Sequence, residues 1–126
     1  MYSGWPIVLK NLKRRYRVGV ITSAPGKYAQ TILENGGCDV FDLMVTDVPY
    51  HGKARRLRQI LTDKKLQPNE VVYVGDEVRD LEACLKTGIS FVAVDWGKDH
   101  AKLFAACRNQ VRAVLRKPKD LLAVLS

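Results

Sequence analysis

The sequence has few cysteines and no long apolar run. Cys38, Cys84 and Cys107 are widely separated, and an odd set at these spacings forms neither a disulfide framework nor a Cys-x-x-Cys metal site. We therefore expect a protein of the reducing cytoplasm. No apolar stretch approaches the roughly 18 residues that a membrane-spanning helix needs, and none has the pattern of a signal peptide. The sequence thus predicts no membrane partner.

Acidic residues are also scarce. The 13 Asp and Glu are outnumbered by 21 Lys and Arg, so the net charge is 21 − 13 = +8 at pH 7. The basic residues gather in three runs, at 10–17, 53–65 and 102–119. A nucleic-acid surface would need interleaved aromatic side chains for stacking, and the third run contains only Phe104. The runs therefore favour solvated helix faces that attract anionic metabolites, with nucleic-acid binding kept as an alternative.

Strand-like and helical patterns alternate along the 126 residues, a length that suits one domain. The predicted strands are 18–21, 43–45, 71–74 and 91–94, and the predicted helices are 5–15, 27–34, 53–61, 79–86, 101–106 and 120–125. Four apolar strands separated by helices predict an α/β fold, a three-layer Rossmann-like parallel sheet with helices on both faces. We expect Ile7, Val8, Leu9 and Leu12 to face the core of this single domain, and Cys84 to lie in it.

Polar residues follow the predicted strands, where the ligand crevice of a parallel sheet lies. Thr22 and Ser23 can offer hydroxyl and backbone N–H groups to an anion, or can simply cap a helix. Lys53 begins a predicted helix after His51-Gly52. Its ammonium would be a point charge on phosphate if it reached the crevice, and a solvated surface charge otherwise.

The most specific motif is Gly75-Asp76-Glu77-Val78-Arg79-Asp80, directly after the third strand. Gly75 allows a sharp turn at the strand end, and Asp80 lies one helical turn beyond Asp76 on the same face. Two carboxylates in this arrangement suit a hard cation, with Mg²⁺ the natural candidate. The alternative is that Asp76 and Glu77 only complement a helix N-terminus, a role that does not require Asp80 at this spacing.

These motifs resemble the haloacid dehalogenase-like superfamily, specifically its phosphoglycolate-phosphatase-like branch. The matching segments are VGVITSAP, HGKARRLRQIL and YVGDEVRDLEACLKTGISFVAVDWG, within about residues 5–97. The resemblance implies a magnesium-dependent phosphate-monoester hydrolase acting on a small phosphorylated metabolite. It assigns to Thr22 the hydroxyl that hydrogen-bonds the phosphoryl group and to Lys53 the cation that neutralises it. It assigns Mg²⁺ binding to Asp76, and support of the lysine and the metal site to Asp80.

The sequence departs from the family pattern upstream of Thr22. The family's nucleophile is the first Asp of an Asp-x-Asp pair at the end of a central first strand, and residues 1–17 contain neither Asp nor Glu. The resemblance therefore implies a partial domain without its first strand and cap, and an activity that is absent or very weak in this chain alone. We expect the neighbouring strands to pair directly, or a second chain to supply the missing strand (a second copy or a separately encoded partner), or the sequence to be a truncated product.

Two further functions stay open. A catalytically silent phosphate-binding or assembly module would use the same hydroxyl, ammonium and carboxylate groups without a nucleophile. Asp47 follows the second predicted strand as a receiver-domain phosphoacceptor would, but the acidic pair that a receiver needs after its first strand is missing. Whether the chain is itself an enzyme is therefore left undecided by its sequence.

Overall fold

The computed structural model describes residues 5–21, 43–46, 48–49, 52–94 and 109–125. The chain divides into two compact units, one formed by residues 1–50 and 117–126 and the other by residues 51–116. Each unit has its own parallel strand ladder. The helices predicted at 27–34 and 101–106 lie outside the described residues.

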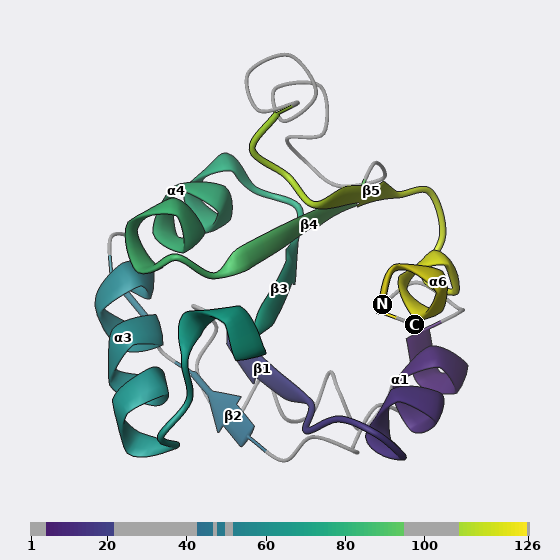
Figure 1. Ribbon diagram of the computed structural model, residues 1–126, viewed down its shortest axis with the longest axis horizontal. Coiled ribbons are helices and arrows are strands. Elements are labelled where there is room, and N and C mark those ends of the chain that lie inside the picture. The colour runs from purple at the N-terminus through teal and green to yellow at the C-terminus, as the bar shows by residue number, and fades with distance from the viewer. Residues whose placement is uncertain (1–4, 22–42, 47, 50–51, 95–108, 126) are drawn as a thin grey trace. The chain divides into compact units, whose positions relative to one another are not determined.

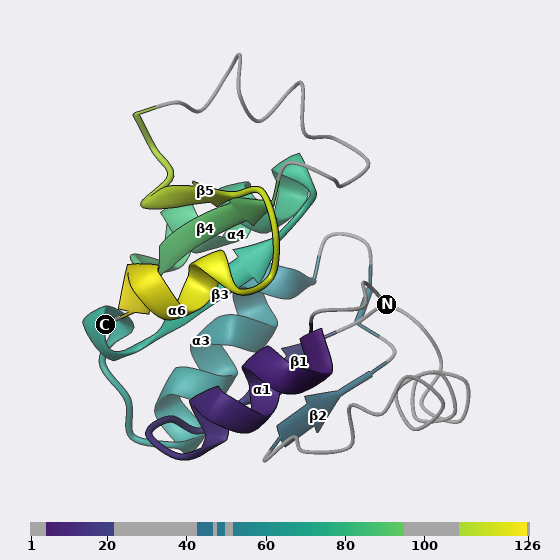
Figure 2. The ribbon, with the colours of Figure 1, turned by 90° about the vertical axis from the view of Figure 1, so that its right-hand side faces the viewer.

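The first unit combines a two-stranded ladder with two helices that contact each other (Figures 1 and 2). Its elements are α1 (Trp5–Lys13), β1 (Gly19–Ile21), β2 (Leu43–Val45) and α6 (Asp120–Leu125). β1 pairs with β2 in parallel, with Gly19 opposite Leu43. The Tyr16 hydroxyl donates to the Leu125 carbonyl oxygen at 2.9 Å, which ties the chain after α1 to the end of α6.

The second unit holds a three-stranded parallel sheet in the order β3-β4-β5. Its elements are α3 (Lys53–Asp63), the 3₁₀ turn η1 (Pro68–Glu70), β3 (Val72–Gly75), α4 (Val78–Thr87), β4 (Ser90–Val94) and β5 (Ala113–Leu115). The apolar run 91–94 of the central strand β4 is fully buried, as expected for a strand paired on both sides. α4 contacts β3 and β4 and packs against α3 (Figure 1), so the two helices and the sheet share one core.

The predicted α/β fold with parallel strands is confirmed, and the predicted elements within the described residues are all present. β5 was not predicted, because its three residues lie between Arg112 and Arg116 inside the third basic run. The prediction for Ile7 was wrong, since its side chain is 69% exposed while Val8, Leu9 and Leu12 are buried. Among the described residues, no helix has the length and apolarity needed to cross a membrane.

The end of α4 gives a first testable prediction. Gly88 has φ 78°, the left-handed conformation that its position after Thr87 predicted, and a Cβ there would lie 3.4 Å from Pro68 Cβ. We expect Gly88→Ala to lower the free energy of unfolding by about 1–2 kcal/mol, because left-handed backbone is strained for a residue with a Cβ. The measurement is urea denaturation.

Lys65 provides a control for which we do not expect the loss of stability predicted for Gly88→Ala. It has φ 56°, the one positive φ among the described residues other than glycine. Lys65→Gly should therefore leave the stability unchanged or raise it by about 0.5 kcal/mol, since glycine adopts this conformation without strain. Equal losses in the two variants would contradict the conformational explanation.

Candidate functional site

Lys53 and Asp80 form an ion pair between α3 and α4. Lys53 is the first residue of α3, after the N-cap Gly52, and Asp80 lies in the first turn of α4. Lys53 Nζ donates to Asp80 Oδ1, and the two side chains are only 12% and 4% exposed. Within the described residues Lys53 makes no other hydrogen bond, so its ammonium keeps donors for a further oxygen ligand.

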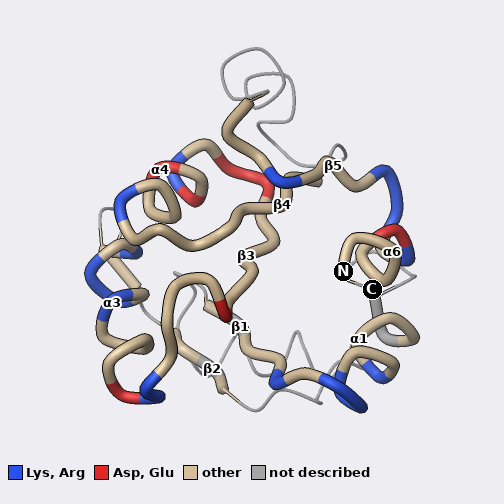
Figure 3. Tube along the Cα trace, in the orientation of Figure 1, with Lys and Arg blue, Asp and Glu red and all other residues tan. Residues whose placement is uncertain are grey.

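Three carboxylates gather where β3 passes into α4. One oxygen each of Asp76, Glu77 and Asp80 lies within 4.8 Å of the others, and Figure 3 shows acidic residues along the segment that joins β3 to α4. Glu77 forms an ion pair with Arg79 at 2.7 Å, and Asp80 pairs with Lys53. No described residue donates to Asp76 or forms an ion pair with it.

This donor set fits a small hard cation. Carboxylate oxygens are the ligands that Mg²⁺ prefers, and the cluster offers three of them from one short segment. Two of the three carboxylates are already partly balanced by Lys53 and Arg79. Asp76 is therefore the carboxylate best placed to bind a cation directly, with Glu77 and Asp80 beside it.

Gly75 is required for close packing rather than for a turn. It is the last residue of β3, and its φ is not in the left-handed region, which the glycine of a sharp turn would often adopt. A Cβ at Gly75 would lie 2.8 Å from Asp80 Oδ2 and 3.0 Å from ring carbons of Tyr73 and Phe91. The absence of a side chain thus lets the Asp80 carboxylate lie directly against the strand.

Burial dominates the electrostatics around Asp80. Desolvation raises the pKa of Asp80, and the Lys53 ammonium acts in the opposite direction through its hydrogen bond and its charge. Burial together with the Asp80 charge raises the pKa of Cys84 to about 12. Cys84 is 1% exposed, so the prediction that it belongs to the core is confirmed and its thiol is a poor nucleophile.

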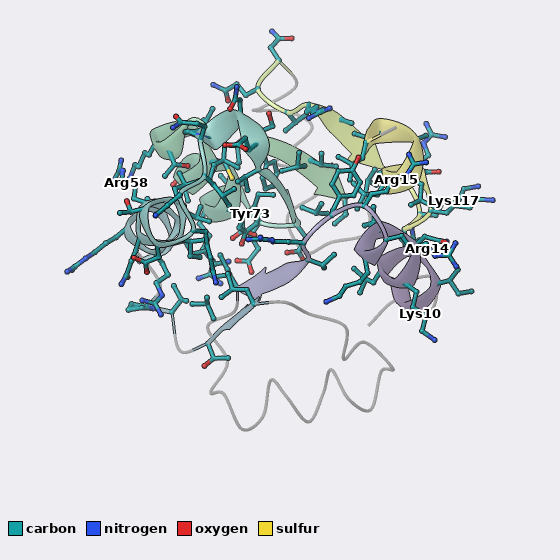
Figure 4. The ribbon with its side chains drawn as sticks, turned by 60° about the horizontal axis from the view of Figure 1, so that its bottom comes forward. Lys10, Arg14, Arg15, Arg58, Tyr73 and Lys117 are labelled. Carbon is teal, nitrogen blue, oxygen red and sulfur yellow. The ribbon has the colours of Figure 1, made fainter. Side chains whose placement is uncertain are left out.

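Tyr73 is a member of this cluster that the sequence analysis did not single out. Its hydroxyl donates to Asp80 Oδ1 at 3.4 Å, and its ring centroid lies 5.9 Å from Lys53 Nζ. The ring also stacks on Phe91 of β4, with centroids 6.0 Å apart (Figure 4 shows Tyr73 within the molecule). The available signal was strand alternation, because Tyr73 and Gly75 are two residues apart and share a face of β3.

The structure brings together three of the five predicted site residues. Lys53, Asp76 and Asp80 lie in one cluster of the second unit. Thr22 and Ser23 lie outside the described residues, as does Asp47, so their predicted roles stay predictions.

The chain is similar to haloacid dehalogenase-like proteins in sequence and structure. Residues 1–94 match the family model described as haloacid dehalogenase-like hydrolase. A phosphoglycolate phosphatase of Synechococcus elongatus is 33% identical over 129 residues, which cover all of this chain and 59% of that protein. The chain therefore spans about three fifths of the length of this curated relative.

Solved structures agree with the sequence match. A haloacid dehalogenase-like family hydrolase from Streptococcus pneumoniae superposes with a TM-score of 0.80 at 26% identity, covering 95% of this chain and 57% of that one. A predicted phosphoglycolate phosphatase from Haemophilus somnus gives a TM-score of 0.86 at 21% identity, over 99% of this chain and 57% of that one. Because the family model matches about three quarters of the sequence, this chain belongs to the haloacid dehalogenase-like hydrolase family.

Proposed function

We propose that this chain carries the phosphate- and magnesium-binding half of a phosphate-monoester hydrolase of the phosphoglycolate-phosphatase-like type. The observation that carries the proposal is the Lys53–Asp80 pair beside Asp76. It combines a largely buried ammonium that retains hydrogen-bond donors with a carboxylate that no described residue neutralises. A phosphate bound with Mg²⁺ needs both a cationic donor and an anionic metal ligand.

Each residue has a defined role in this proposal. Lys53 donates to a non-bridging phosphate oxygen and offsets its charge, while Asp80 holds the ammonium in place. Asp76 binds Mg²⁺, which when present polarises the phosphoryl group and orients it. Thr22 and Ser23, which follow β1 in the sequence and lie outside the described residues, are proposed to donate to the same phosphate. The substrate class is a small phosphorylated metabolite.

We further propose that this 126-residue chain hydrolyses phosphate esters very weakly on its own. Residues 1–21 contain no Asp or Glu to supply the aspartyl nucleophile that the family resemblance implies. Loss of a nucleophile removes most of the rate enhancement and leaves mainly the contribution of binding and electrostatics. Binding of Mg²⁺ and phosphate should therefore persist where turnover does not.

The first test is magnesium binding by the purified chain, measured by isothermal titration calorimetry. Asp76→Asn should weaken Mg²⁺ binding at least about tenfold, because an amide oxygen carries no formal charge to offset that of the cation. Asp63→Asn makes the same chemical change at the exposed end of α3 and should leave binding unchanged. Equal Mg²⁺ affinity in the Asp76 variant and the parent chain would contradict the metal assignment.

The second test separates a hydrolase from a silent binding module. Release of p-nitrophenol from p-nitrophenyl phosphate is measured with Mg²⁺, with and without a peptide that carries an Asp-x-Asp strand. Turnover that appears with this peptide, and not with its Asn-x-Asn counterpart, supports the hydrolase. If neither peptide gives turnover although Mg²⁺ and phosphate bind, the non-catalytic phosphate-binding or assembly module is the better description.

A further inference from the structure

Tyr73 is the one aromatic side chain in the described residues that contacts both members of the Lys53–Asp80 pair. Its hydroxyl donates to the same oxygen, Asp80 Oδ1, that accepts from Lys53 Nζ. Its ring centroid is 5.9 Å from that ammonium, within the range of a cation–π interaction. The tyrosine therefore acts on the ammonium both directly and through the carboxylate.

The surroundings of Tyr73 hold it in a fixed position. The ring stacks on Phe91, a fully buried residue of the central strand β4. It also lies against Gly75, where a Cβ would approach to 3.0 Å from a Tyr73 ring carbon. A ring packed on two neighbouring strands has few rotamers available, and the groups that it contacts are restrained in turn.

The Asp80 carboxylate is restrained on both of its oxygens. Oδ1 accepts from Lys53 and Tyr73, while Oδ2 faces the backbone at Gly75. Because a lysine side chain has four rotatable bonds, a single hydrogen bond to one carboxylate leaves its ammonium considerable freedom. The Tyr73 ring supplies the second restraint on Nζ.

We propose that Tyr73 is a positioning residue that holds the Lys53 ammonium, through Asp80 and through its own ring, in the orientation that accepts an anion. This inference rests on the proposed function for the identity of the anion, a phosphate group. It assigns no chemical step to the phenol, whose pKa is raised by burial and by the Asp80 charge, so Tyr73 keeps its proton. The proposed role requires tyrosine, because phenylalanine would keep the ring contact with Lys53 but lose the hydroxyl that donates to Asp80.

The test follows the Lys53 side chain directly by NMR on protein labelled with [¹³C,¹⁵N]lysine. The Lys53 signals are assigned from their loss in Lys53→Met. In the parent chain we expect the Lys53 Hε protons to be shifted by the Tyr73 ring and the Cε group to be motionally restricted. Tyr73→Phe should keep the ring shift and increase Cε mobility, while Tyr73→Leu should abolish the shift as well.

Phosphate binding is measured in parallel by titration with inorganic phosphate in the presence of Mg²⁺. Loss of the hydroxyl in Tyr73→Phe should weaken binding about threefold to fivefold, and loss of the ring in Tyr73→Leu about tenfold or more. Tyr16→Phe is the matched control, because it removes a hydroxyl that donates to the Leu125 carbonyl in the other unit. It should change neither the Lys53 signals nor phosphate binding.

The outcomes separate this inference from the proposed function. Unchanged Lys53 mobility in Tyr73→Phe overturns the positioning role, whatever the phosphate affinity. Increased Lys53 mobility with unchanged phosphate affinity also overturns it, because the orientation of the Lys53 ammonium would then have no effect on anion binding. If the parent chain binds no phosphate, the proposed function fails, and the Lys53 signals still decide whether Tyr73 restrains the ammonium. Increased Lys53 mobility in Tyr73→Phe, together with weaker phosphate binding, supports both the positioning role of Tyr73 and the proposed function.

Discussion

Replacing Lys53 by methionine is expected to lower the free energy of unfolding by about 3–5 kcal/mol at pH 7, as is typical when one partner of a buried ion pair is removed. The Asp80 side chain is 4% exposed, and within the described residues only Tyr73 would still donate to it. A largely buried carboxylate would thus lose its one charged partner. The measurement is urea denaturation followed by circular dichroism.

The effect of Lys53→Met should depend on pH in a defined direction. Burial raises the pKa of Asp80 above its value in the unfolded chain, and Lys53 lowers it, so removing Lys53 raises it further. A carboxyl group with a raised folded-state pKa costs stability as the pH rises through its unfolded pKa near 4. The penalty in the variant should therefore be largest at neutral pH and shrink as the pH falls to about 4 and below, where Asp80 becomes protonated in both states.

Two further variants test whether the loss of stability in Lys53→Met comes from the unpaired buried charge. Lys86→Met removes an exposed lysine of α4 and should change stability by less than about 0.5 kcal/mol. Lys53→Met combined with Asp80→Asn removes both charges, and it should recover most of the loss because no buried charge is left unpaired. A single Lys53 variant as stable as the Lys86 variant would show that the pair does not stabilise the fold.

Gly75→Ala is expected to be the second most damaging substitution, lowering the free energy of unfolding by about 1–3 kcal/mol. The added Cβ would lie 2.8 Å from Asp80 Oδ2 and 3.0 Å from two aromatic ring carbons, so several packed groups would have to move together. One of these groups is the Asp80 carboxylate, which holds Lys53. We therefore expect Gly75→Ala to lower the phosphate affinity as well as the stability. Both quantities are measured on the same purified variant.

Gly19→Ala is the matched control for this substitution. Gly19 also lies in a strand, and the nearest atom to its added Cβ would be Leu43 Cβ at 3.3 Å, a milder contact. We expect a change of less than about 1 kcal/mol, since alanine also gains a little from its lower conformational entropy in the unfolded chain. Equal losses at the two positions would mean that Gly75 is needed only as a strand glycine and not for its contact with Asp80.

The sequence predicted the strand-and-helix order well because its apolar runs are short, continuous and clearly bounded. The run at 91–94 became the buried central strand β4, and Gly88 ended α4 as its position suggested. β5 was missed because a three-residue strand between Arg112 and Arg116 has too short a pattern to separate from a basic loop. Its Leu115 is nevertheless fully buried, which is a property of the tertiary fold rather than of the local sequence.

The sequence could predict the part of the candidate site that depends on the spacing of residues along a single helix. Asp76 and Asp80 lie at the junction and in the first turn of the same helix, so their proximity follows from helical geometry. The pairing of Lys53 with Asp80 was inferred from family resemblance, and the structure shows it across 27 positions of the sequence. Strand alternation places Tyr73 on the same face of β3 as Gly75. The contact of Tyr73 with Asp80 and the steric role of Gly75 could not be predicted, because both depend on how α4 lies against β3.

The position of Lys53 at the first turn of α3 has a consequence for how the site forms during folding. Its ammonium reaches Asp80 only when α3 and α4 have docked, so a peptide spanning residues 71–94 would contain the acidic cluster without the cation. Anion affinity should therefore appear cooperatively, together with tertiary structure, and no fragment that lacks α3 should display it. Partial unfolding of α3 would turn the same surface from one that attracts phosphate into one that repels it.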